Sequence, residues 1–141
     1  NSVMNISLES RDIISMSNIA NLLKENQNNK DFVNAIEGYK RLKNIVKQNT
    51  TMDINPKLFT IKDEIKLYEQ FEIIKSQFTN ESIRKSPKKT LTGILNITPF
   101  LSNFFENVLV MDKNEKIKNN RISLLTKIKD LISRFANLSE I

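Results

Sequence analysis

The sequence contains no cysteine and no histidine, and only two of its 141 residues are glycine. The missing cysteine and histidine exclude disulfides, thiolate nucleophiles, imidazole acid–base catalysis and zinc sites built from Cys and His. Two glycines, Gly38 and Gly93, are too few for a glycine-rich phosphate-binding loop. An enzyme made from the remaining residues would rely on carboxylates or lysines, so the composition favours a binding or scaffolding domain.

Long hydrophobic runs are also absent. No apolar stretch approaches the roughly 18 residues that span a bilayer, and no basic-then-apolar signal segment stands at the start. We therefore expect no membrane partner and a cytoplasmic location. The chain opens at Asn1 rather than at methionine, which indicates a piece of a longer protein, and 141 residues suffice for a single domain.

Acidic residues are missing from two stretches, although the whole chain has 16 Asp and Glu against 22 Lys and Arg, a net charge of +6. The first stretch contains Lys40, Arg41, Lys43 and Lys47. The second, residues 82–105, contains Arg84, Lys85, Lys88 and Lys89. Two local concentrations of positive charge indicate a polyanionic partner, because phosphate contacts supply most nucleic-acid affinity. An ordinary solvated face is the alternative.

Apolar residues recur at spacings of three and four, which together with the scarcity of Gly and Pro predicts an all-α fold, a helical bundle of about five helices. Helices are expected over about 10–25, 31–48, 61–78, 87–108 and 114–135, with a polar linker at 49–56 and a charged loop at 79–87. We expect one domain over 1–141, with two leading helices in 1–50 and a three-helix part in 57–141.

Local signals set the details of these helices. Asp31 and Thr60 are expected caps for the second and third helices. Pro99 falls within the fourth, and because the apolar stripe continues across it without a change of phase, we expect one kinked helix rather than two. The inward stripe of the second helix is predicted to be Phe32, Ile36, Tyr39, Leu42 and Val46, and that of the third Ile61, Ile65, Tyr68, Phe71, Ile74 and Phe78.

Lys40, Lys43, Asn44 and Lys47 fall on one stripe beside the apolar face of the second helix. Such a row could follow a nucleic-acid backbone, with Asn44 able to donate and accept hydrogen bonds. The alternative is a solvated flank whose lysine stems cover the edge of the core. Residues 84–89 precede or open the fourth helix, where backbone N–H groups add donors for phosphate.

Arg121 is a charged residue on the apolar stripe of the last helix, so it needs a partner or a route to solvent. We expect a structural ion pair with Glu106, with Asp112 as the second choice, rather than a ligand contact. The close carboxylate pairs of the third helix have no His, Cys or metal motif near them. They are interpreted as surface charge, and we expect no catalytic residue and no metal site.

Four segments resemble one family. Residues 104–111 read FFENVLVM, which is similar to the FFDxVxVM signature near the C-terminus of bacterial glycyl-tRNA synthetase β chains. Residues 120–125, NRISLL, resemble that family's NRLxLL segment, and 136–141, ANLSEI, resemble its ADLSxL-type end. Upstream, residues 40–45, KRLKNI, resemble a KRxxNI motif. Order and spacing agree across 40–141, and the departures at Glu106, Ile122 and Asn137 are mild.

The resemblance implies a C-terminal anticodon-binding domain of the DALR type that contacts tRNA-Gly. It also implies that glycine–tRNA ligation, with ATP and Mg²⁺, takes place elsewhere in an α2β2 enzyme, with no cofactor in this domain. The expected partners are then tRNA-Gly, the rest of the β chain and the α chain. A helical domain that docks another protein without touching RNA is the alternative, and it predicts an exposed apolar patch.

Overall fold

The computed structural model describes residues 21–46 and 53–139. Residues 21–26 are helical, followed by α2 (Lys30–Ile45), α3 (Lys62–Ile74), α4 (Asn80–Lys85), α5 (Pro87–Asn107) and α6 (Glu115–Ser139). Two short 3₁₀ turns, η1 (Pro56–Leu58) and η2 (Lys75–Phe78), flank α3. Across these described ranges there is no strand, so the all-α prediction is confirmed. Most of the first predicted helix lies outside them, as does Lys47.

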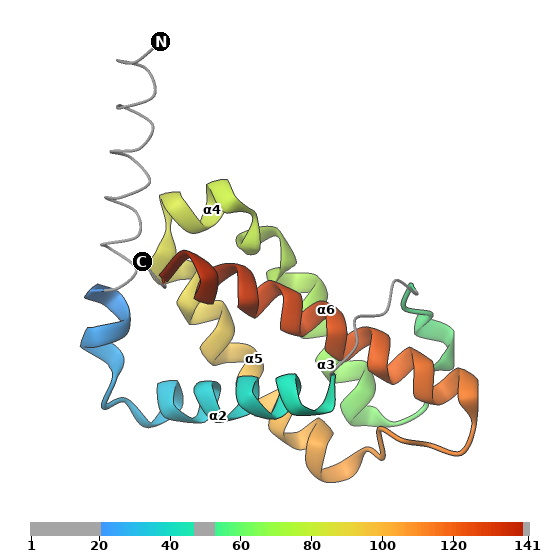
Figure 1. The fold of residues 1–141 in the computed structure, drawn as a ribbon. Helices are drawn as coiled ribbons and strands as arrows, with labels where there is room; N and C mark the ends of the chain where they lie inside the picture. The colour runs from blue at the N-terminus through green and yellow to red at the C-terminus, as the bar shows by residue number, and fades with distance from the viewer. Residues whose placement is uncertain (1–20, 47–52, 140–141) are drawn as a thin grey trace.

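Helix α5 is the centre of the packing. It contacts α2, α3 and α4, and α6 closes the bundle against α2, α3 and η2. In Figure 1, α2 lies across α5 at the front of the view, and α4 stands at the opposite end of the molecule from the loop between α5 and α6. The first basic stretch therefore lies on α2, whereas the second lies on α4 and in the first turn of α5.

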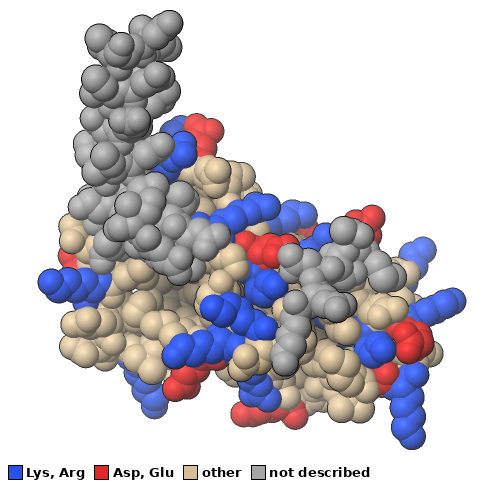
Figure 2. Space-filling model, viewed as in Figure 1, with Lys and Arg blue, Asp and Glu red and all other residues tan. Residues whose placement is uncertain are grey.

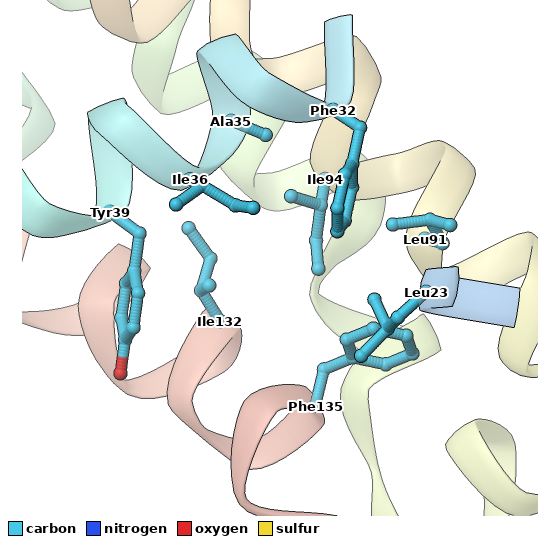
Figure 3. Close-up of a pocket in the computed structure, with 9 residues that line it drawn as sticks. All are labelled: Leu23, Phe32, Ala35, Ile36, Tyr39, Leu91, Ile94, Ile132 and Phe135. Atoms are coloured by element: carbon cyan, nitrogen blue, oxygen red, sulfur yellow. The ribbon is translucent and has the colours of Figure 1, made fainter. Parts of the chain in front are cut away.

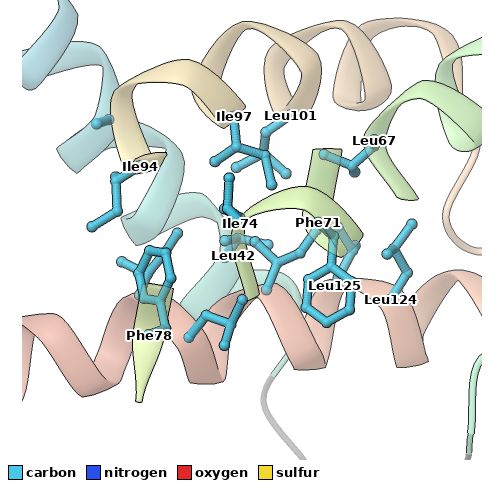
Figure 4. Close-up of a cluster of buried hydrophobic side chains, with 14 of the residues drawn as sticks. Leu42, Leu67, Phe71, Ile74, Phe78, Ile94, Ile97, Leu101, Leu124 and Leu125 are labelled. Carbon is cyan, nitrogen blue, oxygen red and sulfur yellow. The ribbon is translucent and has the colours of Figure 1, made fainter. Parts of the chain in front are cut away.

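The core lies where α3, α5 and α6 meet under α2, and Figure 4 shows side chains from all four helices and η2 pointing into it. The most deeply buried include Leu42, Leu67, Phe78, Phe104 and Leu124, each with none of its surface exposed. Burying a Leu or Phe side chain stabilises a fold by about 1.5–3 kcal/mol. This shared cluster explains why four helices from distant parts of the sequence form one body.

The apolar stripes were predicted with partial success. Ile36 and Ile65 were expected to face inward, yet they are 39% and 40% exposed, so both predictions are wrong. On α3, Leu67 takes the buried position, one turn from Phe71, and the stripe is rotated toward Glu64. Periodicity alone could not find this phase, because it treats the charged Glu64 as an outward residue.

Two helix starts differ from the sequence prediction. The cap of α2 is Asn29, whose side chain accepts the N–H of Asp31 at 2.8 Å, rather than Asp31 itself. Helix α3 begins after Ile61, whose N–H donates to the Glu64 side chain at 3.3 Å, so Thr60 is not the cap. The start of the last helix, expected near 114, is confirmed, since the Asn114 side chain accepts from the N–H groups of Lys116 and Ile117.

The charged loop predicted over 79–87 is wrong, because this stretch contains α4. Thr79 caps this helix by accepting the N–H of Ser82 at 3.1 Å, and Ile83 anchors it with none of its surface exposed. Helix α4 has six residues and one buried apolar side chain, so its sequence shows no hydrophobic periodicity. The second helix also ends earlier than predicted, at Ile45 rather than near Gln48.

Helix α5 runs through Pro99 as one element, as the unbroken apolar stripe predicted. Proline has no N–H, so the α-helical hydrogen bond to the carbonyl of Leu95 is missing at this point. Thr98 donates its hydroxyl to the Ile94 carbonyl at 2.8 Å on the buried side. The burial of Ile94, Ile97 and Leu101 on either side of the proline keeps the helix in place.

A mainly apolar pocket of about 170 Å³ opens where the helical residues 21–26 meet α2, α5 and α6. Figure 3 shows Leu23, Phe32 and Phe135 around one end and Tyr39 at the other.

Within the described ranges, no helix combines the length and apolarity needed to cross a membrane.

Candidate nucleic-acid interface

The predicted basic residues of α2 are all on its outer side. Lys40, Arg41, Lys43 and Asn44 are exposed, while Leu42 between them is fully buried and fixes the rotation of the helix. The α2 stripe therefore reaches solvent, as an RNA-binding role requires. Whether it touches RNA stays a prediction.

The structure separates Arg41 from the lysines of α2. The Arg41 guanidinium carbon lies 4.5 Å above the centre of the Phe105 ring of α5, whereas the Lys43 ammonium lies 5.0 Å above the Tyr39 ring. Tyr39 in turn shares a hydrogen bond of 2.7 Å with Ser133 of α6. At 100° per residue, Arg41 is about 160° around the helix from Lys43. One cation therefore flanks the α2–α5 seam and the other the α2–α6 seam.

A cation of α6 joins the second seam. The Lys129 ammonium donates to the Val46 carbonyl at the end of α2 at 3.3 Å, a favourable position for a cation at a helix C-terminus. Figure 2 shows Lys and Arg side chains gathered along α2 and α6 on the face in view. Sequence reasoning missed Lys129, because only the packing of α6 on α2 brings it beside this stripe.

The second basic stretch surrounds the start of α5. Lys88 and Lys89 are exposed in the first turn, where the positive end of the helix dipole disfavours cations but attracts phosphate. A polar pocket of about 250 Å³ lies beside them, between η2, α4 and α5. It is lined by Ser76, Gln77, Ser82, Lys85, Ser86, Lys89 and Thr90.

One of these cations already has an acidic partner. Lys85 and Glu81 form an ion pair of 2.9 Å along α4. The hydrogen bond to Glu81 raises the pKa of Lys85, and Lys85 lowers the pKa of Glu81. Because Glu81 lies just before the acid-free stretch, the pair reduces the positive charge that this surface offers to a phosphate.

The two predicted patches are distinct surfaces. Lys88 begins α5, and Phe105, under Arg41, lies near its end. At 1.5 Å per residue, their separation of 17 positions spans about 25 Å along the helix axis. A ligand that touches both must therefore extend along most of α5.

Arg121 has a different environment from these cations, since only 3% of its side chain is exposed. One guanidinium nitrogen, Nη2, lies 2.9 Å from Glu64 Oε1, and the other, Nη1, lies 3.5 Å from Asp112 and donates to the Leu109 carbonyl at 2.5 Å. The predicted pairing with Glu106 is wrong, because Glu106 is exposed on α5 and Glu64 of α3 takes its place. Asp112, the second choice, is confirmed as an additional partner.

Asn120 works beside Arg121, and sequence reasoning gave it no role. Its side chain accepts the N–H of Asn55 at 2.7 Å and donates to the Asn55 carbonyl at 3.0 Å. Together these two neighbours on α6 hold three segments: the chain before η1, the first turn of α3 and the α5–α6 loop. The NR pair of the motif NRISLL is therefore a structural clamp.

The clamped α5–α6 loop presents apolar side chains to solvent. Val108 is buried, whereas Leu109 and Met111 are 65% and 57% exposed. Within the described ranges this is the apolar exposure that the alternative, protein-docking interpretation predicted. The loop is extended at Val108 and is fixed through the Leu109 carbonyl.

Comparison with known proteins decides the family. The model of the DALR anticodon binding domain matches residues 35–139, which is most of the chain and runs from within α2 to the end of α6. The chain belongs to the DALR anticodon-binding domain family. The match confirms the DALR-type fold that the motifs FFENVLVM and NRISLL suggested.

Curated relatives of this DALR domain are similar along most of its length. It is 36% identical over 111 residues to the glycine–tRNA ligase beta subunit of Thermodesulfovibrio yellowstonii, covering 79% of this chain and 16% of that subunit. It is 36% identical over 124 residues to the same subunit of Halothermothrix orenii, covering 87% and 18%. The chain thus spans about a sixth of the length of these relatives.

Proposed function

We propose that this chain is the tRNA-binding domain of a bacterial glycine–tRNA ligase β subunit and contributes to the recognition of tRNA-Gly. The observation that carries the proposal is the family match over residues 35–139, together with similarity to glycine–tRNA ligase beta subunits. The exposed cations of α2 support it, because RNA loops are read by contacts to splayed bases while Lys and Arg hold phosphates.

Under this proposal, tRNA recognition and catalysis take place in different parts of one enzyme. This domain has no catalytic residue, and the ligation of glycine with ATP and Mg²⁺ takes place elsewhere in a cytoplasmic α2β2 assembly. The remainder of the β chain and the α chain are then its protein partners. This would explain why a chain whose relatives are subunits of a ligase contains no His and no Cys.

The test is the binding of a tRNA-Gly transcript at two salt concentrations. Reversing two charges of the α2 stripe, Lys40→Glu/Lys43→Glu, should weaken binding by at least about tenfold and reduce the slope of log K against log salt by one to two units. The same measurement on Lys88→Glu/Lys89→Glu tests the α5 surface separately. Because all four side chains are exposed, the melting temperature should not change.

The matched control is Lys113→Glu/Lys116→Glu, a double reversal of exposed lysines near the other end of α6. It changes the net charge equally and should cost much less affinity. If neither patch alters the affinity or the salt slope more than this control does, these residues are not the contact surface. No salt-dependent binding by the unaltered protein would reject RNA binding by this domain.

A second candidate function, docking of another protein, is favoured by one observation. Leu109 and Met111 are exposed on a loop that Arg121 fixes. The charges of residues 106–118 cancel, with three acids and three lysines, so this surface is suited to protein rather than to phosphate. Leu109→Ser/Met111→Ser should then weaken contact with the rest of the β chain and leave tRNA-Gly affinity unchanged.

A further inference from the structure

A second polar pocket, of about 350 Å³, lies in the seam between α2 and α5. Asp31 and Asn34 line it from the first turns of α2, and the α5 side surrounds Pro99. The full lining is Asp31, Asn34, Leu95, Asn96, Thr98, Pro99 and Ser102. It lies on the opposite side of α2 from the Lys40 and Lys43 stripe, so it is not part of the lysine surface described above.

Pro99 leaves a carbonyl of α5 without its helical partner beside this pocket. Because proline has no N–H, the Leu95 carbonyl lacks its helical donor, and Leu95 lines the pocket. An unpaired helix carbonyl requires a donor from elsewhere, from water or from a ligand. The proline ring itself offers a flat apolar contact at the pocket wall.

The side chains around this carbonyl retain hydrogen-bonding capacity. Asn34, Asn96 and Ser102 are exposed, and among the described residues their side chains form no hydrogen bond with one another or with a neighbour. The backbone of Asp31 is held by the Asn29 cap, which leaves its carboxylate to accept. The pocket therefore combines an acceptor, the Asp31 carboxylate, with two amides that can donate and accept, beside the Leu95 carbonyl.

Arg41 continues the same seam. It lies seven residues after Asn34, on the same side of α2 and about 10 Å further along. Its guanidinium stacks on Phe105, an arrangement that uses the face of the group and leaves its N–H edges for a phosphate. A base site and a phosphate site thus lie within the reach of one short single strand.

We propose that this seam binds an unpaired segment of RNA, with one splayed base in the pocket and an adjacent phosphate on Arg41. The base is one with an exocyclic amino group, adenine, cytosine or guanine, because the Asp31 carboxylate and the nearby Leu95 carbonyl are acceptors. Asn34 and Asn96 complete the contacts to the base edge, and Pro99 packs against its face. The proposal rests on the proposed function and adds to it where, and by what chemistry, a base is read.

The experiment compares two RNA stem–loops that differ only in the loop, one with cytosines and one with uracils. The two bases have the same size, but cytosine presents an amino group where uracil presents a carbonyl. The unaltered protein should bind the cytosine loop at least about fivefold more tightly. Asp31→Asn should remove most of this preference, because the new amide can also donate to the uracil carbonyl. Asn34→Ala/Asn96→Ala should weaken both complexes, with an unchanged salt slope because no charge is altered.

Two further variants separate the parts of the site. Arg41→Gln should weaken both complexes alike and reduce the salt slope by about one unit, as expected for a phosphate contact. Asn80→Ala, an exposed amide at the start of α4, is the matched control and should change neither affinity nor preference. Alanine is tolerated at exposed helix positions, so all of these proteins should melt alike.

The outcomes distinguish this proposal from the proposed function. Equal binding of the two loops, or a preference that survives Asp31→Asn, overturns the base pocket while RNA binding stands. Failure of the unaltered protein to bind either stem–loop or a tRNA-Gly transcript in a salt-dependent way overturns both.

Discussion

Arg41 and Arg121 are the same residue type in opposite environments. Arg41 is exposed above Phe105, with its N–H edges accessible, whereas Arg121 is 3% exposed and holds Glu64, Asp112 and the Leu109 carbonyl. A buried charge is tolerated only when it is paired, so Arg121 is fixed by the fold. An exposed cation contributes little to stability and is available to a ligand. One end of the molecule therefore uses its charge for structure, whereas the charges of the α2 surface remain exposed to solvent.

The largest expected effect comes from removing the buried ion pair of Arg121 and Glu64. Arg121→Met leaves Glu64 buried and unpaired, and should lower the free energy of unfolding by about 3–5 kcal/mol. The measurement is denaturant or thermal unfolding. Arg121→Met/Glu64→Leu removes both charges and should recover much of the loss. Loss of RNA binding with unchanged melting behaviour would contradict the structural role.

A smaller loss of stability is expected from changing Asn120, the residue before Arg121. Asn120→Ala removes both hydrogen bonds to the Asn55 backbone and should lower the free energy of unfolding by about 1–3 kcal/mol. In the unaltered protein the Asn55 N–H donates to the Asn120 side chain at 2.7 Å, so in the variant this amide hydrogen should exchange with solvent faster. Unchanged exchange at Asn55 would show that the clamp does not depend on Asn120.

The exposed Glu81–Lys85 pair tests the other side of the comparison. Glu81→Gln should leave the melting temperature unchanged, because both side chains are in water. If the surface around Lys85 and Lys89 contacts RNA, the same change frees Lys85 and should strengthen tRNA-Gly binding by a few-fold, with a steeper salt slope. Tighter binding without a steeper slope would mean that Lys85 does not contact phosphate.

The smallest effect concerns the pair Tyr68 and Glu72 on α3. The hydrogen bond to Glu72 raises the pKa of Tyr68, and Lys75, followed by Tyr68, lowers the pKa of Glu72. A lowered carboxyl pKa contributes stability above the ordinary carboxyl pKa, and this is lost as the pH falls through the folded value. Glu72→Gln should therefore flatten the acid side of the stability profile slightly. It should also move the phenolate absorbance titration of Tyr68 to lower pH.

The sequence by itself determined the fold class and much of the helix pattern, because apolar spacing acts within a few residues. The start of α5 at Pro87 and its passage through Pro99 could be predicted in this way. Charge also varies locally, so the exposed lysines of α2 could be predicted from the sequence. The family could be predicted only from the motifs, because hydrophobic periodicity does not distinguish one helical family from another.

Only the tertiary structure decided which residues meet. Glu64 and Arg121 are 57 residues apart, and an ion pair across that distance depends on how α3 packs against α6. The separation of Arg41 from Lys43, the arrival of Lys129 at the end of α2 and the polar seam beside Pro99 have the same cause. Each requires the rotation and crossing of helices, which the packing of Leu42, Leu67 and their neighbours fixes and which a single helix cannot specify.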